Sequence, residues 1–172
     1  MNFSVNNNKN NYIKDYKNYL FYIKKKKLYL PLIILVISGV LFLADLLINS
    51  EFDFVGIAIY PCFLGLFFLL LEIISTLKAL KSINDSANIF KFGVENLIIE
   101  PTQLKISSGQ VRYETFFLSQ ITKCLILNNA MFLVFKSKNE WPIRINRLEI
   151  GEENFIKLVK FLERRQIKVE YK

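Results

Sequence analysis

Two long apolar runs decide how this chain folds: LYLPLIILVISGVLFLADLLI at residues 28–48 and FVGIAIYPCFLGLFFLLLEIISTL at residues 54–77. A helix rises about 1.5 Å per residue, so about 20 apolar residues are needed to cross the hydrocarbon core of a bilayer. Both runs reach that length, and only the short connector 49–53 separates them. The sequence therefore predicts a transmembrane hairpin of two helices. Pro31 is expected in the first helical turn, where its missing N–H is tolerated.

Basic residues flank both open ends of the hairpin, whereas the charges of the connector, Glu51 and Asp53, are acidic. Lysines next to membrane helices favour the cytoplasmic side. We therefore expect a multi-pass membrane protein with the connector outside and both termini in the cytoplasm. High usage of Asn, Lys, Ile and Phe fits a bacterium with AT-rich coding, so the expected location is a bacterial cytoplasmic (inner) membrane. The residues expected to contact the membrane surface are Lys24, Lys25, Lys26, Lys27, Lys78 and Lys81.

The composition argues against several classes of function. The 172 residues carry a net charge of +8, but the lysines next to the apolar runs favour a lipid bilayer over nucleic acid as partner. The chain has no histidine, two cysteines and six glycines. Zinc sites of the usual Cys and His type, histidine-dependent catalysis and glycine-rich phosphate loops are therefore not predicted. We expect no enzyme activity, no catalytic residues, no metal and no cofactor, and we predict that Cys124 is a small core or edge residue of a strand.

Two carboxylates, Asp45 and Glu72, fall within the predicted membrane helices. An ionisable residue in a membrane is a functional candidate by default. Each lies roughly 10 Å from the midplane and near opposite faces, so we expect solvated or snorkelling side chains that do not pair with each other. An ion or proton pathway is the alternative. Gly39 and Gly65 are expected at similar depth, which suits close helix contact.

Residues 1–27 form an N-terminal segment before the hairpin. Residues 5–11 are too polar to predict packing. Between Tyr12 and Ile23, however, aromatic and aliphatic residues recur at three- and four-residue spacing, which predicts an amphipathic helix at 12–23. Two positions are open for this helix, along the membrane face or against the C-terminal domain.

The C-terminal domain, residues 88–172, follows a linker at 78–87 and consists of short apolar segments separated by turn residues such as Asn128 and Asn129. Strands are predicted at 88–92, 96–100, 103–107, 111–118, 121–127, 131–136 and 141–146. Residues 152–165 form an amphipathic helix with an apolar stripe of Phe155, Leu158, Val159 and Leu162. The predicted fold class is membrane α+β, with the hairpin followed by an antiparallel sheet or half-barrel that one C-terminal helix caps.

A basic rim is predicted around the end of the last strand, where a protein partner or anionic lipid is expected to bind. The residues of this rim are Lys136, Lys138, Trp141, Arg144 and Arg147. Trp141 is either an anchor at the membrane interface or a side chain packed at a strand end. Three carboxylates near the last helix, Glu149, Glu152 and Glu153, are interpreted as complementing its dipole.

The order of these parts resembles that of the YcxB-like bacterial membrane proteins. The residues that carry the resemblance are Tyr12 and Tyr16 in a Tyr-x-x-x-Tyr element, RYETFFLSQITK at 112–123, MFLVF at 131–135, PIRINR at 142–147 and the last helix. The resemblance covers nearly the whole chain. It implies a membrane-tethered C-terminal domain of pleckstrin-homology-like (PH-like) fold, a strongly bent sheet capped by one helix, and it implies no catalytic or binding residue.

The leading hypothesis is a membrane-anchored interaction module, which displays the C-terminal domain at the cytoplasmic face and binds a protein partner or the lipid surface. The alternative is an immunity-type protein that neutralises a toxin at the membrane. A third hypothesis is an enzyme or transporter subunit that uses Asp45 or Glu72. The sequence leaves open the ligand of the C-terminal domain and whether the chain forms a homo-oligomer.

Overall fold

The computed structural model describes residues 1–48, 54–89, 92–108, 113–137 and 140–172. Contacts within the chain divide it into two compact units. The β unit consists of Met1–Asn18 and Asn84–Lys172, and the hairpin unit consists of Tyr19–Ile83. The boundaries between the units fall inside the two long helices, so each of these helices contributes residues to both units.

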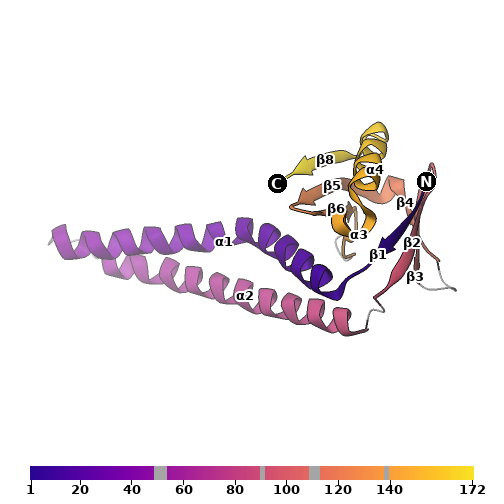
Figure 1. Cartoon of the computed structure of the whole chain (residues 1–172). Helices are drawn as coiled ribbons and strands as arrows, with labels where there is room; N and C mark the ends of the chain where they lie inside the picture. The colour runs from indigo at the N-terminus through magenta and orange to yellow at the C-terminus, as the bar shows by residue number, and fades with distance from the viewer. Residues whose placement is uncertain (49–53, 90–91, 109–112, 138–139) are drawn as a thin grey trace. The chain divides into compact units, whose positions relative to one another are not determined.

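The hairpin unit consists of the larger parts of two helices, α1 (Lys9–Ile48) and α2 (Phe54–Ile89), which run side by side in opposite directions (Figure 1). Both are long and apolar enough to span a membrane. The predicted helices 28–48 and 54–77 lie within them, so the two apolar runs are confirmed as helical. Only 11% of the most apolar window of each helix is buried within the chain, so most of the apolar side chains face outward.

Both helices extend beyond the apolar runs. The predicted amphipathic helix 12–23 is the first part of α1, which continues without a break into the apolar run. No glycine or proline interrupts residues 9–30, so nothing in the sequence stops the helix at the four lysines. Pro31 therefore lies inside α1, and its predicted place in a first turn is wrong. Residues 78–87, the predicted linker, are also helical, as part of α2.

The β unit contains two four-stranded sheets, with strand order β1-β2-β3-β4 in sheet A and β7-β6-β5-β8 in sheet B. The strands of sheet A are β1 (Asn2–Asn6), β2 (Val94–Ile99), β3 (Gln103–Ser108) and β4 (Tyr113–Phe117). The strands of sheet B are β5 (Ile121–Leu127), β6 (Ala130–Phe135), β7 (Ile143–Asn146) and β8 (Lys168–Tyr171). The 3-10 turn η1 (Leu118–Gln120) joins the sheets, and the helices α3 (Arg147–Ile150) and α4 (Glu152–Arg164) follow β7.

Most of the predicted elements are confirmed to within two residues: the strands at 96–100, 103–107, 121–127, 131–136 and 141–146, the described part of 111–118, and the helix at 152–165. The predicted turn between β5 and β6 is also present. Asn128 adopts a φ of 52° there, a left-handed conformation that asparagine tolerates better than most residues.

Three strand assignments differ from the prediction. Residues 88–89 belong to α2, so the predicted strand 88–92 is wrong there, while 90–91 lie outside the described residues. β1 pairs with β2 and buries Phe3 and Val5, although the sequence predicts no packing for residues 5–11. β8 pairs with β5 in parallel, because α4 supplies the crossover connection that a parallel pair needs. The predicted single antiparallel sheet is therefore two sheets, of which sheet B is mixed.

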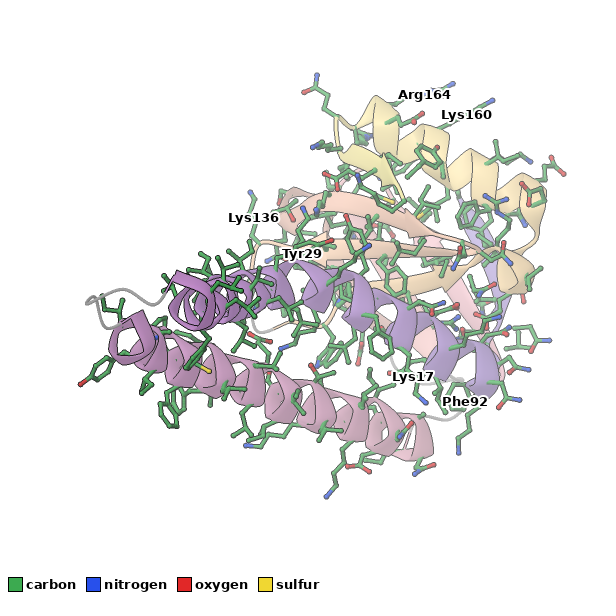
Figure 2. All side chains as sticks on the ribbon, turned by 90° about the vertical axis from the view of Figure 1, so that its left-hand side faces the viewer. Lys17, Tyr29, Phe92, Lys136, Lys160 and Arg164 are labelled. Carbon is green, nitrogen blue, oxygen red and sulfur yellow. The ribbon has the colours of Figure 1, made fainter. Side chains whose placement is uncertain are left out.

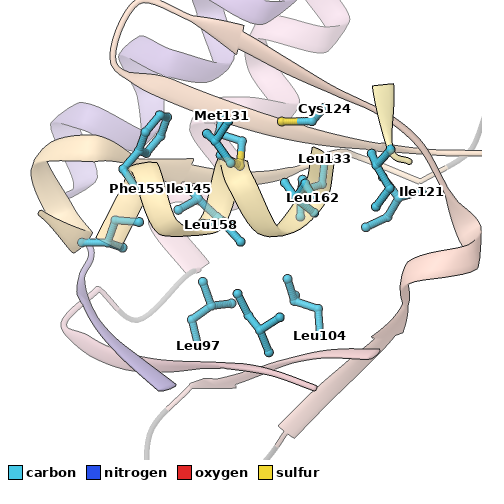
Figure 3. Close-up of a cluster of buried hydrophobic side chains, with 14 of the residues drawn as sticks. Leu97, Leu104, Ile121, Cys124, Met131, Leu133, Ile145, Phe155, Leu158 and Leu162 are labelled. Carbon is cyan, nitrogen blue, oxygen red and sulfur yellow. The ribbon is translucent and has the colours of Figure 1, made fainter. Parts of the chain in front are cut away.

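The core of the β unit lies between the two sheets and α4 (Figure 3). Leu97 and Leu104 project from sheet A towards Leu158 and Leu162 of α4. The predicted apolar stripe of α4 is buried along its whole length, as expected for a helix that closes a core. Cys124 is also fully buried, which confirms it as a core residue, and burial raises the pKa of its thiol to about 12.

Candidate functional site

The β unit contains a cavity of about 680 Å³. Its walls come from β1, the first part of α1, the end of α2, sheet A and sheet B with the residues before β7. The lining residues are Val5, Asn7, Tyr12, Tyr16, Ser86, Ile89, Glu95, Leu97, Ile106, Glu114, Phe116, Trp141, Pro142, Ile143, Arg144 and Ile145. Most of them are apolar or aromatic, as in typical small-molecule sites, and the polar ones include carboxylates and one guanidinium.

Tyr16 holds the first part of α1 against this cavity. Its buried hydroxyl donates a hydrogen bond to the Pro142 carbonyl oxygen at 2.7 Å. Its ring lies edge-on to the rings of Trp141 and Phe132, with centroids 5.8 Å apart in both pairs. Of the two positions open for the segment 12–23, Tyr12 and Tyr16 therefore occupy the one against the C-terminal domain. Trp141 packs at the start of β7 and is still 47% exposed.

Arg144 is the centre of a buried polar network beside the cavity. Its Nη1 donates to Asp15 Oδ2 at 2.8 Å and its Nη2 donates to Glu149 Oε2 at 2.6 Å. Asn146 Nδ2 also donates to Asp15 at 2.6 Å, and the backbone N–H of Asn8 donates to Glu149 at 3.1 Å. Charge-assisted hydrogen bonds of this kind are strong when both partners are shielded from water. The charge of Arg144 is therefore neutralised by two carboxylates.

Glu95 is the unusual group of the site, because its side chain is buried and only partly satisfied. The residue is 6% exposed. Its Oε2 accepts a hydrogen bond from Asn7 Nδ2 at 2.5 Å, but its Oε1 has no hydrogen-bond partner among the described residues. Burial raises the pKa of Glu95 to about 7, although the hydrogen bond from Asn7 and the charge of Arg144 lower it.

Carboxylates outnumber cations among the described residues that line the cavity. Glu114, from β4, lines it as an exposed second carboxylate. Neither Glu95 nor Glu114 has an ion-pair partner within the described part of the chain. In the same part of the chain, no group of three His, Cys, Asp or Glu side chains is arranged to hold a metal ion.

The described residues of the predicted basic rim differ in exposure, and some of them are not exposed. Arg144 does not lie on an exposed rim, because its side chain is 3% exposed and doubly paired. Arg147 is partly buried, 3.4 Å from Glu152, and its guanidinium lies 4.7 Å from the centroid of the Phe155 ring. Lys136 is exposed and points away from the fold, as do Lys160 and Arg164 of α4 (Figure 2). Lys138 lies outside the described residues.

The lysines of the hairpin unit also fall into two groups. Lys24 is 8% exposed, and its Nζ lies 2.7 Å from both Glu72 Oε2 and Ser75 Oγ. Glu72 therefore has a cationic partner across the hairpin, which no local pattern in the sequence indicates. The other lysines expected at a membrane surface, Lys25, Lys26, Lys27, Lys78 and Lys81, are exposed. The side chain of Asp45 lies outside the described residues.

Sequence reasoning missed the two acidic residues that characterise the site, Asp15 and Glu95. A signal for Glu95 was present in the strand pattern. Side chains alternate between the two faces of a strand, so Glu95 shares the buried face of β2 with Leu97 and Ile99. The predicted strand began at residue 96 and therefore left Glu95 outside. Asp15 carries no comparable signal, because its partner Arg144 is 129 positions away.

Comparison with known proteins gives this site no counterpart. No family model, no curated protein and no solved structure matches the chain.

Proposed function

We propose that this chain is a membrane-anchored interaction module, in which the α1–α2 hairpin spans a bacterial cytoplasmic membrane and the β unit binds a protein partner or the lipid surface at the cytoplasmic face. The observation that carries the proposal is the exposed apolar surface of both helices. Their large apolar side chains include exposed Leu47, Phe63 and Leu77. In water this surface is unfavourable, and in lipid it is not.

Two other interpretations, the core helix of a soluble protein and a cleaved signal sequence, account for these helices less well. The core helix of a soluble protein is mostly buried, whereas only 11% of each apolar window is buried here. A cleaved signal sequence would account for one apolar segment close to the N-terminus. It leaves α2 unexplained, because this helix has similar length and apolar character and begins at Phe54.

The lengths of the helices fit a hairpin that also extends into the cytoplasm. At about 1.5 Å per residue, the 40 residues of α1 extend about 60 Å, roughly twice the hydrocarbon core of a bilayer. The bilayer therefore covers the apolar run, and residues 9–27 remain on the cytoplasmic side. The exposed lysines Lys25, Lys78 and Lys81 then lie where the positive-inside rule requires them.

We also propose that the β unit is a PH-like domain of the YcxB-like kind. Two sheets enclose one core, and α4 packs its apolar face into that core. Two features extend this scheme: β1 precedes the hairpin in sequence, and β8 follows α4. A module of this kind acts by binding, and the cavity and the exposed cations of α4 are its two candidate surfaces.

Paired reporter fusions test the proposal. A fluorescent protein that matures only in the cytoplasm and a phosphatase that is active only in the periplasm are each fused to the C-terminus of the full chain, and each is inserted into the connector 49–53. We expect fluorescence from the C-terminal fusion and phosphatase activity from the connector insertion. Phosphatase activity at the C-terminus would overturn the orientation. Purified chain that stays monodisperse in buffer without detergent would overturn the anchor itself.

A further inference from the structure

Among the described residues that line the cavity of the β unit, carboxylates outnumber cations, although the chain as a whole carries a net charge of +8. Arg144, the one cation among the described lining residues, is already paired with Asp15 and Glu149. Glu95 and Glu114 line the same cavity without an ion-pair partner in the described part of the chain. The charge that the described lining residues present to a ligand is therefore negative.

Within this cavity, Glu95 Oε1 is the atom that most requires a partner. Native structures satisfy nearly all buried polar atoms, because a buried carboxylate oxygen without a donor is costly. Glu95 is 6% exposed, and the hydrogen bond from Asn7 to Oε2 holds the side chain in place. A positively charged donor that enters the cavity would complete the hydrogen bonds of Oε1 and neutralise the carboxylate.

The remaining walls suit a cation that carries an apolar body. The rings of Tyr12, Tyr16, Phe116 and Trp141 line the cavity, and the faces of aromatic rings attract ammonium groups. Ile106 adds aliphatic surface. The volume of about 680 Å³ lies within the range of small-molecule sites, roughly 300–1,000 Å³.

We propose that this cavity binds a small organic cation, whose ammonium group faces Glu95 and Glu114 and whose apolar body lies against the aromatic wall. An anion does not fit, because both sides of the Arg144 guanidinium are occupied by carboxylates. A neutral apolar ligand fits less well, because it leaves Glu95 Oε1 without a donor. The inference goes beyond the membrane anchor, and all the residues that carry it belong to the β unit.

Three probes with the same body and different heads separate these possibilities: 4-phenylbutylamine, 4-phenylbutanol and 4-phenylbutyrate. Each is titrated into the full-length chain in a non-ionic detergent. Trp141 is the only tryptophan of the chain and lines the cavity, so its fluorescence reports occupancy. Calorimetry repeats each titration, so that a silent fluorophore does not hide binding. We expect saturable binding of the amine, binding of the alcohol that is at least tenfold weaker, and no binding of the carboxylate.

Glu95→Gln tests whether the carboxylate recognises the amine. The amide keeps the size of the side chain, and circular dichroism checks that the variant is folded. We expect the amine to bind at least tenfold more weakly, with the weak binding of the alcohol unchanged. Glu153→Gln is the matched control, because this carboxylate is exposed on α4 outside the cavity, and it should leave all three titrations unchanged.

A pH series gives a second readout. The amine remains protonated between pH 6 and 8, whereas Glu95 changes its charge there, so affinity should rise about tenfold over this range. Arg144, Glu149 and Glu114 are the other charged groups that act on Glu95, and Glu95→Gln retains all three, so its titration should be flat. Equal binding of amine and alcohol, preferred binding of the carboxylate, absence of amine binding, or an amine affinity that Glu95→Gln leaves unchanged would each overturn the inference. None of these outcomes changes the result of the reporter fusions.

Discussion

Arg144 Nη2 lies 2.6 Å from Glu149 Oε2, and each of the two side chains is only 3% exposed. The same guanidinium binds Asp15 with its other terminal nitrogen, at 2.8 Å. This buried triad joins the first part of α1 to β7 and α3, which are adjacent in the chain, and Asp15 and Arg144 are 129 positions apart in the sequence. It is therefore a structural connection within the β unit, and its Arg144 also lines the cavity.

Replacing Arg144 with methionine should destabilise the β unit strongly. The substitution leaves Asp15 and Glu149 buried without their cation, and breaking a buried ion pair in this way costs about 3–5 kcal/mol. Thermal unfolding of the detergent-solubilised chain, followed by circular dichroism, measures the loss. Lys157→Met is the control, because Lys157 forms an exposed pair with Glu153 on α4, and exposed pairs contribute little to stability. Equal stability of the two variants would contradict the structural role of the triad.

The triad also shows what the sequence predicted and what it did not. Apolar runs and periodicity located α1, α2, α4 and most strands, because these patterns depend only on residues near one another in the chain. Arg144 was assigned to an exposed rim because it lies near Arg147 at a strand end, with Lys136 and Lys138 in the preceding turn. Its burial depends on Asp15, 129 positions away, and no local pattern records such a partner.

Local sequence patterns also failed to show the distant partners that define two strands and one contact of the hairpin. β1 is short and polar on one face, and only its pairing with β2 buries Phe3 and Val5. β8 was missed because four residues after a helix carry little periodicity, and its parallel partner β5 is separated from it in the chain by β6, β7, α3 and α4. The pair between Lys24 and Glu72 joins residues 48 positions apart across two helices. In each case the decisive interaction is between segments distant in the chain.

A large side chain in place of Gly65 should destabilise the helix pair, whereas a large side chain in place of Gly39 should be tolerated. A Cβ atom at Gly65 would lie 3.0 Å from Leu35 Cγ and 3.2 Å from Ile34 Cγ2, so α1 and α2 approach closely there. A Cβ at Gly39 meets nothing within 4 Å. We expect Gly65→Leu to cost about 1–3 kcal/mol through overpacking. Gly39→Leu, made in the same helix pair, should change stability far less.

Thermal stability of both glycine variants in the same detergent decides this prediction, with size-exclusion chromatography as a check on aggregation. A Gly39→Leu variant that loses as much stability as Gly65→Leu would show that both glycines lie at contacts. The sequence had assigned a packing role to both residues, and the structure supports it for Gly65 alone.

Lys24→Met should destabilise the hairpin unit, because it leaves Glu72 without its cation and Ser75 without its donor. Both side chains of the pair are largely shielded, and the loss of one partner should cost about 2 kcal/mol. Lys25→Met is the matched control, because Lys25 is the exposed neighbour.

The reversed pair, Lys24→Glu with Glu72→Lys, distinguishes the ion pair from a simple loss of charge. The double variant should recover most of the stability that either single substitution removes. Thermal unfolding in detergent measures all four proteins. If the stability loss of the double variant equals the sum of the losses of the two single variants, the two residues do not interact as the structure places them.

Glu95 should make the β unit less stable as the pH rises. Burial raises its pKa from the ordinary value of 4.5 to about 7, so the native state binds the proton more tightly than the unfolded chain. Between these two pH values the unfolded chain loses the proton first. Stability is therefore highest at low pH as far as this group is concerned, and it falls as the pH passes from about 4.5 to 7.

Glu95→Gln should remove this dependence, because the amide cannot ionise. We expect the variant to be more stable than the parent chain by about 2 kcal/mol at pH 8 and to match it at pH 4.5, with the full effect of the pKa shift reduced because the carboxyl faces an open cavity. Unfolding of both proteins at a series of pH values, in the same detergent, measures the difference. The stability difference between the parent chain and the variant is therefore expected to change between pH 4.5 and 8. A constant difference would mean that the Glu95 carboxyl is accessible to water and is not buried on the apolar face of β2.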